Sequence, residues 1–271
     1  MILLHISDTH FGTVVEAVRE ALLRFARLQK PDIVLLSGDI TQRARRGQFV
    51  SARHFIWQLA CPVLAVPGNH DIPLFNLLAR WLHPYGNYRA VLGEDLEPEF
   101  ENDSLLLVGV NTTRAARHKN GEVSQQQIAR VTRRLHRARP GQLRVVMQHH
   151  PVRAVEESDV SNLLIGRERA VPAWVDAGMD ILLAGHIHLP YVRPLQGATG
   201  RKGWTVQAGT ALSRRIRGAV PNSVNLIRYE QTVAALPGST SRGRCVLERW
   251  DYAQAAAYFV RVEAGEIELA Q

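Results

Sequence analysis

Short apolar runs alternate with amphipathic stretches along the first two-thirds of the chain, and this alternation constrains the fold more than any other feature. Residues 32–36 read as a strand buried on both faces, whereas residues 14–29 carry apolar side chains at helical spacing. Further strands are predicted at residues 1–7, 62–66, 105–110, 143–147 and 179–183, and further helices at residues 49–59 and 124–137. This alternation predicts an α/β fold with a parallel sheet at its core.

The remaining third of the chain changes character. Residues 204–207, 223–229, 245–250 and 258–262 have strand-like patterns, and no convincing helical pattern lies among them. We expect these strands to form a second, largely antiparallel sheet that packs on the first. The predicted fold is therefore an α/β fold in which a two-sheet β-sandwich is flanked by helices. No linker divides the chain, so residues 1–271 are expected to form a single domain.

Cysteine content and charge limit the setting and the partners. The chain has two cysteines, Cys61 and Cys245, so a disulfide-based fold is excluded and a reducing, cytoplasmic setting is expected. No apolar run approaches the roughly 20 residues that cross a bilayer. The first residues are expected to form a strand and not a signal peptide. The formal net charge of +8 favours anionic partners such as phosphate esters, nucleic acid or an acidic membrane surface.

Side chains that can bind metals directly follow five of the predicted strands. Because ligands of open α/β sheets bind beyond the carboxyl ends of the strands, these five loops are expected to converge on one rim. The side chains concerned are Asp8, His10, Asp39, Asn69, His70, Asp71, His149, His150, His186 and His188. One such loop alone has an ordinary explanation as a turn, a helix cap or a surface histidine, but five such loops together indicate a metal site.

The kinds of donor atom indicate which metals the site would take. The set contains carboxylates, one amide and several imidazoles, but no thiolate. These donors suit Mn, Fe, Co or Zn, whereas Ca and Mg prefer oxygen ligands. The candidates also exceed what one tetrahedral ion needs, so we expect two ions, an arrangement that recurs in phosphoester hydrolysis.

These loops resemble the signature motifs of the calcineurin-like metallophosphoesterase superfamily. The matching residues are Asp8 and His10, Gly38 and Asp39, Gly68 to Asp71, His149 to Pro151, and Gly185 to His188. More narrowly, residues 111–113 and 121–124 are similar to stretches of the bacterial class III cyclic-nucleotide phosphodiesterases. Asn111 departs from that group, which typically has an aspartate at this point.

The resemblance implies a role for each candidate. One metal would be held by Asp8, His10, Asp39 and His188, and the other by Asp39, Asn69, His149 and His186, with Asp39 bridging both. His70 would be a catalytic side chain that protonates the leaving group, and Asp71 would orient its ring. His150 receives no role. The implied reaction is in-line attack on phosphorus by a hydroxide that the two metals generate from a shared water.

Two groups of arginines lie outside these motifs. Arg130, Arg133, Arg134 and Arg137 share one helix face, which we interpret as solvated, with contact to nucleic acid or a membrane as the less favoured alternative. Arg214, Arg215 and Arg217 follow a Gly-Thr corner that also matches the family layout. We interpret one of these three as a candidate ligand of the substrate phosphate.

The sequence therefore predicts a phosphodiesterase with two metal ions, acting on a 3′,5′-cyclic nucleotide or a similar small phosphodiester. One alternative is a membrane-associated hydrolase of UDP-2,3-diacylglucosamine or of a glycerophosphodiester, with an apolar cap contributed by residues 83–106 or 155–164. A nuclease and a metal-free scaffold are weaker alternatives, since a scaffold does not need the complete set of ligands. A homodimer is left open.

Overall fold

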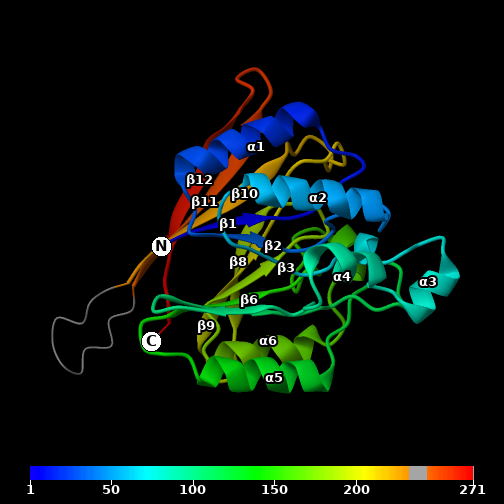
Figure 1. Ribbon diagram of the computed structural model, residues 1–271. Coiled ribbons are helices and arrows are strands. Elements are labelled where there is room, and N and C mark those ends of the chain that lie inside the picture. The colour runs from blue at the N-terminus through cyan, green and yellow to red at the C-terminus, as the bar shows by residue number, and fades with distance from the viewer. Residues whose placement is uncertain (232–242, 271) are drawn as a thin grey trace.

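The computed structural model describes residues 1–231 and 243–270, which form two β-sheets packed face to face with helices on both outer sides (Figure 1). The first sheet has the order β12-β11-β10-β1-β2-β3. Its strands are β1 (Ile2–Ile6), β2 (Ile33–Leu36), β3 (Val63–Ala65), β10 (Ser223–Glu230), β11 (Arg244–Ala253) and β12 (Tyr258–Ile267). The predicted sandwich flanked by helices is confirmed.

The second sheet has the order β4-β5-β6-β7-β9-β8. Its strands are β4 (Glu99–Glu101), β5 (Leu105–Gly109), β6 (Leu143–Met147), β7 (Ile181–Ala184), β8 (Tyr191–Gln196) and β9 (Lys202–Gln207). The helices are α1 (Glu16–Gln29), α2 (Arg46–Gln58), α3 (Leu77–Leu82), α4 (Gly86–Leu92), α5 (Gln125–His136) and α6 (Arg167–Asp176). In Figure 1, α1 and α2 cover the outer face of the first sheet, while α5 and α6 cover that of the second.

Alternation along each inner strand explains why these strands are mostly apolar. In β1, Leu3 belongs to the core between the sheets, and Leu4 belongs to the core between the sheet and its helices. In β2, Leu35 faces the other sheet, whereas Val34 and Leu36 face the helices. A strand with a buried layer on both sides favours apolar side chains, and the one polar side chain within β1, His5, is buried and hydrogen-bonded to Ser37 at 2.8 Å. Most polar residues therefore begin where the strands end.

The predicted arrangement of the last strands is wrong. Residues 204–207 lie in β9, which pairs in parallel with β7, so the second sheet is largely parallel. Strands β10, β11 and β12 instead extend the first sheet, with β10 antiparallel to β1. The period-two pattern of a strand shows that it is half-buried, but the strand edge with which it pairs depends on tertiary packing.

Several helical features follow the predictions closely. Helices α1 and α2 begin and end within three residues of the predicted bounds. Ser124 caps α5, since its hydroxyl accepts from the Gln127 amide at 3.1 Å while the Gln127 side chain accepts from the Ser124 amide at 2.9 Å. The elements α3, α4, α6, β4 and β8 were not predicted. Within the described residues, none of the helices combines the length and apolarity that a membrane span requires.

Candidate metal centre

The candidate ligands leave the carboxyl ends of five strands that point the same way within their sheets. Strands β1, β2 and β3 are parallel neighbours in the first sheet, and β6 and β7 are parallel neighbours in the second. The His149 ring, which follows β6, donates from Nδ1 to the Ser37 carbonyl after β2 at 2.8 Å. This bond joins the two rims, so the predicted convergence of the five loops is confirmed.

The backbone at this rim is strained. Among the described residues, nine other than glycine have positive φ, and five of them are candidate ligands. These five are Asp8, His10, Asp39, His186 and His188, with φ between 43° and 79°. A side chain in the left-handed region costs on the order of 1–3 kcal/mol unless the surroundings compensate, and such strain clusters at functional sites. The backbone conformation that directs these side chains inward therefore lowers the stability of the fold.

Two glycines allow the loops to approach closely. A Cβ at Gly68 would lie 2.1 Å from the Asp39 amide nitrogen and 2.2 Å from Asp39 Oδ1. A Cβ at Gly185 would lie 1.9 Å from the Ser7 hydroxyl oxygen and 2.4 Å from Asp8 Oδ2. No side chain fits at these separations, so the glycines of both motifs are required by the contact between loops from different strands.

One set of donor atoms surrounds Asp8, which is fully buried. His188 Nε2 lies 3.1 Å from Asp8 Oδ1 and 3.1 Å from His10 Nε2. His10 Nε2 also lies 3.7 Å from Asp39 Oδ2. Donors about 2.1 Å from one ion lie about 3.0–3.4 Å from one another in octahedral or tetrahedral geometry. His188 Nε2 stands at this spacing from Asp8 and from His10, while the separations of His10 from the two carboxylates, 3.7 Å each, are slightly longer.

A second set surrounds the other oxygen of Asp39. His149 Nε2 lies 3.3 Å from Asp39 Oδ1 and 3.2 Å from Asn69 Oδ1. His186 Nδ1 lies 2.9 Å from Asn69 Oδ1 and 3.3 Å from His149 Nε2. The two oxygens of Asp39 thus face different sets.

His149 and His188 show that these sets suit cations. Nδ1 of each ring must donate to a main-chain carbonyl, that of Ser37 at 2.8 Å and that of Arg215 at 2.5 Å. Each Nε2 therefore directs a lone pair at other lone pairs unless the ring takes a second proton. Burial opposes a charge on His149, but the Asp39 carboxylate raises its pKa to about 9. The raised pKa places a second proton on the ring, held between Nε2 and the Asp39 carboxylate, so the cluster attracts a positive charge that either this proton or a metal ion can supply.

His150 is not available as a ligand, although it lies beside His149 and His186. Its Nδ1 is 2.8 Å from the Thr112 hydroxyl, and its Nε2 is 3.0 Å from the Lys119 carbonyl. Burial lowers the pKa of His150 well below its ordinary value, so the ring is neutral. Both nitrogens therefore hold the loop before α5 in place. The sequence motifs assign no role to His150.

The prediction that Asp71 orients the His70 ring is wrong. The His70 ring donates from Nδ1 to the Gln42 carbonyl at 3.0 Å. The Asp71 carboxylate accepts instead from the main-chain amides of Ile40, Thr41 and Gly68 at 3.0, 2.8 and 2.9 Å. These bonds tie the loop after β2 to the loop after β3. Burial, together with the nearby Asp39 carboxylate, raises the pKa of Asp71 to about 6.

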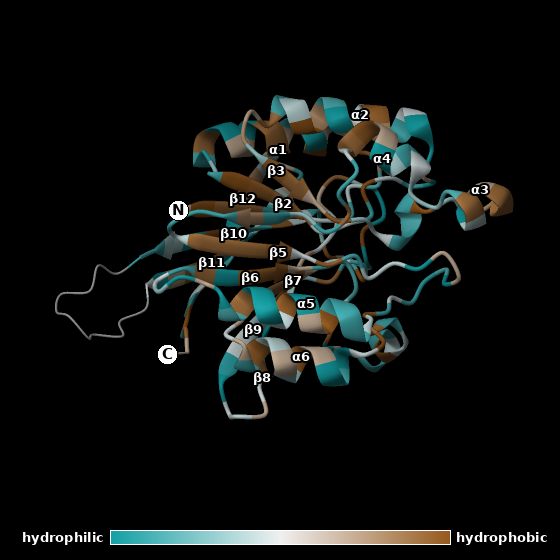
Figure 2. Cartoon of the chain, turned by 60° about the horizontal axis from the view of Figure 1, so that its bottom comes forward, coloured by the Kyte–Doolittle hydropathy of each residue, from teal (hydrophilic) through white to brown (hydrophobic). Residues whose placement is uncertain are grey.

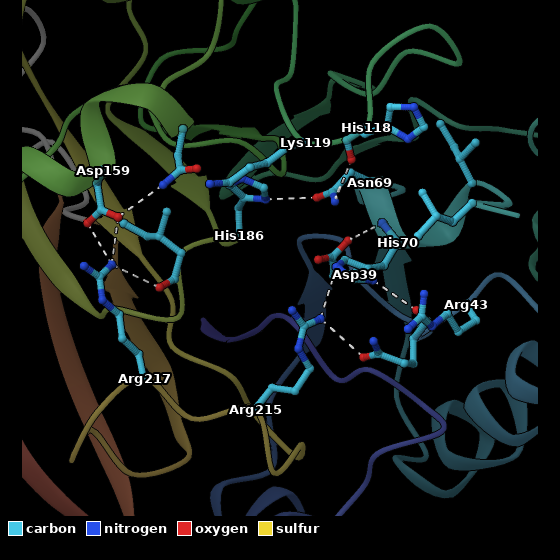
Figure 3. A pocket seen from close by; sticks show the side chains of 15 residues that line it. Asp39, Arg43, Asn69, His70, His118, Lys119, Asp159, His186, Arg215 and Arg217 are labelled. Carbon is cyan, nitrogen blue, oxygen red and sulfur yellow. Dashed lines mark hydrogen bonds and ion pairs between the residues drawn. The ribbon is translucent and has the colours of Figure 1, made fainter.

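The three candidate arginines lie in different surroundings. Arg215 reaches over the centre, where Nη1 lies 3.1 Å from His70 Nε2 (Figure 3). Arg217 lines the same pocket, but its charge is paired with Asp159 at 2.7 Å and with Glu156. Arg214 lines a separate hollow beside α1 and α2, so its assignment to the substrate site is wrong.

The centre opens into a pocket of about 490 Å³, a size that suits a small-molecule ligand. Asp39, Asn69, His70 and His186 lie on its walls, as Figure 3 shows. Sequence reasoning missed other lining residues, namely Gln42, Arg43, His118, Lys119 and Asp159. Gln42 orients His70 through its main-chain carbonyl, which leaves no signal in the side-chain pattern. Arg43 and Gln42 could have been suspected from their place in the loop that begins at Asp39.

Comparison with known proteins identifies the family and the fold. The family of calcineurin-like phosphoesterases matches residues 1–190. A probable glycerophosphodiester phosphodiesterase of Arcobacter nitrofigilis is 25% identical over 201 residues, which cover 69% of this chain and 72% of that protein. A probable cyclic nucleotide phosphodiesterase of a Synechococcus species is 24% identical over 186 residues, covering 67% and 68%. A dimetal phosphatase of Danio rerio superposes with a TM-score of 0.63 at 15% identity, over 100% of this chain and 99% of that one.

Proposed function

Because this chain belongs to the calcineurin-like phosphoesterase family and is a hydrolase of phosphate esters, we propose that it is a phosphodiesterase with two metal ions that acts on a small phosphodiester. The position of Asp39 carries this proposal. Its Oδ2 lies 3.7 Å from one imidazole set and its Oδ1 lies 3.3 Å from the other. A single carboxylate shared by two donor sets is the arrangement that holds two ions close together.

The residues fit the metals that the family implies. Asp8, His10, Asp39 and His188 would hold one ion, and Asp39, Asn69, His149 and His186 would hold the other, with Mn, Fe, Zn or Co as the ions. Bound there, the ions would supply Lewis acidity, both to activate a water and to offset charge on the phosphoryl oxygens. The remaining tasks, which are binding the phosphate and protonating the leaving group, belong to side chains of the pocket.

His70 is placed to hold a proton for the leaving group. Its Nδ1 is occupied by the Gln42 carbonyl, so Nε2 is the atom that faces the pocket beside Arg215. In the structure Nε2 accepts from Arg215. Once Arg215 binds the phosphate instead, a protonated Nε2 can donate to the alkoxide oxygen as its bond to phosphorus breaks. Arg215 would bind a non-bridging oxygen of the same phosphate, since its guanidinium has no carboxylate partner among the described residues.

The substrate we place first is a 3′,5′-cyclic nucleotide, with a glycerophosphodiester as the second member of the same class. Both are named in relatives of this chain, and both are diesters with alkoxide leaving groups that benefit from His70. We suggest a panel of cyclic AMP, glycerophosphodiesters, UDP-2,3-diacylglucosamine and single-stranded DNA, measured with added Mn. Faster turnover of the lipid-linked diphosphate or of DNA than of any small diester would contradict this choice.

Removal of metal should abolish activity reversibly. After complete chelation we expect no hydrolysis of bis-p-nitrophenyl phosphate, because neither donor set offers another group able to activate water. Added Mn, Co or Zn should restore the rate as the two sites fill. The measurement is the initial rate set against metal content by elemental analysis. Full activity of protein shown to be free of metal would refute the proposal.

The arginines offer a matched pair for testing phosphate binding. Arg215→Ala should raise KM about tenfold or more and lower kcat less, because the phosphate charge is present in substrate and transition state alike. Arg214→Ala removes the same charge one residue away, outside the pocket, and should leave both constants near their original values. Steady-state kinetics on one diester distinguish the two. Equal effects of the two substitutions would show that the charge acts only through the general field of the protein.

A further inference from the structure

An apolar protrusion stands beside the mouth of the pocket. Helix α3 and the residues before it extend away from the body of the molecule in Figure 1, and Figure 2 shows this segment as predominantly hydrophobic. Its large apolar side chains are between 60% and 77% exposed. We call them the apolar tip, which consists of Phe75, Leu77, Leu78, Trp81 and Leu82. Soluble surfaces rarely gather so many large apolar side chains without a function for them.

The fold does not use the apolar tip to hold α3 in place. The inward face of the helix carries Arg80, which is buried, and its guanidinium donates to three main-chain carbonyls. Those carbonyls belong to Ala115 at 2.6 Å, Arg117 at 2.6 Å and Pro73 at 2.9 Å. The helix thus turns a cation inward and its leucines and tryptophan outward, the reverse of the usual amphipathic arrangement. The apolar face is left free for a partner.

The surface around the apolar tip is basic. Between residues 40 and 93 the chain has one acidic residue, Asp71, which is buried. Arg43, Arg45 and Arg46 are exposed, and no carboxylate pairs with them in the part of the chain that the structure describes. The Arg43 guanidinium lies 4.8 Å from the centre of the Phe75 ring. One arginine therefore packs against the apolar tip, and two more exposed arginines follow it in the same segment of the chain.

This surface is continuous with the pocket. Ile72 and Leu74, which precede the apolar tip in the same segment, line the pocket together with His118 and Lys119. The loop that carries His118 and Lys119 is also the one whose carbonyls hold Arg80. Whatever covers the apolar tip therefore lies at the entrance to the candidate metal centre.

We propose that the apolar tip docks on an anionic lipid bilayer, with the leucines and tryptophan inserted and the arginines against the headgroups. Apolar insertion flanked by basic side chains is the pattern of peripheral membrane attachment. A second copy of this chain fits less well, because a two-fold interface sets the same arginines against each other and the segment has no exposed carboxylate to pair with them. This inference goes beyond the proposed function and does not depend on it.

Co-sedimentation with vesicles tests the proposal. The protein should bind vesicles of equal parts phosphatidylcholine and phosphatidylglycerol and should bind pure phosphatidylcholine far more weakly, since each basic side chain near the surface adds about fivefold. Leu78→Ser combined with Trp81→Ser should lower the partition coefficient at least about tenfold. Arg45→Glu combined with Arg46→Glu should lower it similarly, and more at low salt than at high salt.

Trp57→Ser is the matched control. Trp57 is 75% exposed, against 64% for Trp81, but it lies at the other end of α2 from Arg45 and Arg46. This control should bind vesicles as the unaltered protein does, and all variants should keep the far-ultraviolet circular dichroism and the hydrolysis of a soluble diester. Equal vesicle binding by the Leu78 and Trp81 variant would overturn the proposal, as would no binding by the unaltered protein. Conversion of a dimer to a monomer by that variant, without vesicle binding, would assign the apolar tip to contact between copies.

Discussion

Asp39→Ala is expected to abolish phosphodiester hydrolysis, with kcat/KM lowered by about 10³-fold or more. The carboxylate faces both donor sets, at 3.3 Å and 3.7 Å, so its removal takes one ligand from each. It also removes the negative charge that separates two neighbouring cations, whose mutual repulsion then opposes double occupancy. A loss of several kcal/mol in stabilisation of the transition state corresponds to a rate effect of about this size.

The measurement has two parts, metal content and rate. We expect Asp39→Ala to bind fewer than two ions per chain by elemental analysis. Asp8→Ala alters only one donor set, so it should retain more of the ion held by Asn69, His149 and His186 than Asp39→Ala does. Circular dichroism checks the fold, because Asp39 Oδ1 also accepts from the His70 amide at 2.8 Å. Asp39→Asn retains an acceptor for that bond and separates loss of metal from loss of structure. A folded Asp39→Ala protein with two ions and full activity would contradict the bridging role.

His70→Ala is expected to have the next largest effect, a fall in kcat of about 10²–10⁴-fold, the range for losing a general acid. Metal content should not change, because the His70 ring contacts the Gln42 carbonyl and Arg215 and packs edge-on against His10, with ring centroids 5.0 Å apart, without itself belonging to either donor set. The loss should depend on the leaving group. An alkoxide needs a proton as it departs, whereas p-nitrophenolate leaves readily without one.

His118→Ala provides the control for this substitution. His118 lines the same pocket and is exposed, and its side chain makes no hydrogen bond with the described residues. Its removal should change kcat by less than about threefold, in keeping with a surface substitution. Rates on an alkyl diester and on bis-p-nitrophenyl phosphate, measured for both variants, give the comparison. Equal losses on both substrates for His70→Ala would rule out proton donation.

The positions of the candidate ligands were readable from sequence because each is tied to a local feature. Asp8, Asp39 and His149 follow largely apolar strands, so the strand end and the candidate ligand coincide. The glycines at positions 68 and 185 carry a similar local signal, since a Cβ at either position would collide with the neighbouring loop. That these side chains bind two metals stays a prediction, for which the donor spacing is the support.

Other features depended on contacts between distant segments. The three neighbouring arginines have different surroundings. Arg214 lines a separate hollow, Arg215 reaches the candidate centre, and Arg217 pairs with an acidic side chain. The ring of His70 is oriented by a main-chain carbonyl, a group that every residue has and that no pattern of side chains reveals. The direction of α3 likewise follows from Arg80 and its three carbonyl partners, not from the apolar spacing of the helix itself.

The sequence by itself determined the α/β sandwich, the rim where five strands end and the family of hydrolases to which the chain belongs, because burial and short motifs are local properties of the chain. Only the tertiary structure decided that β10 pairs with β1, that Asp71 braces two loops and that the apolar tip faces solvent beside the pocket. Each of these three features depends on hydrogen bonds to a segment that is distant in the sequence. Such bonds form only when the whole chain has packed, so a local sequence pattern does not predict them.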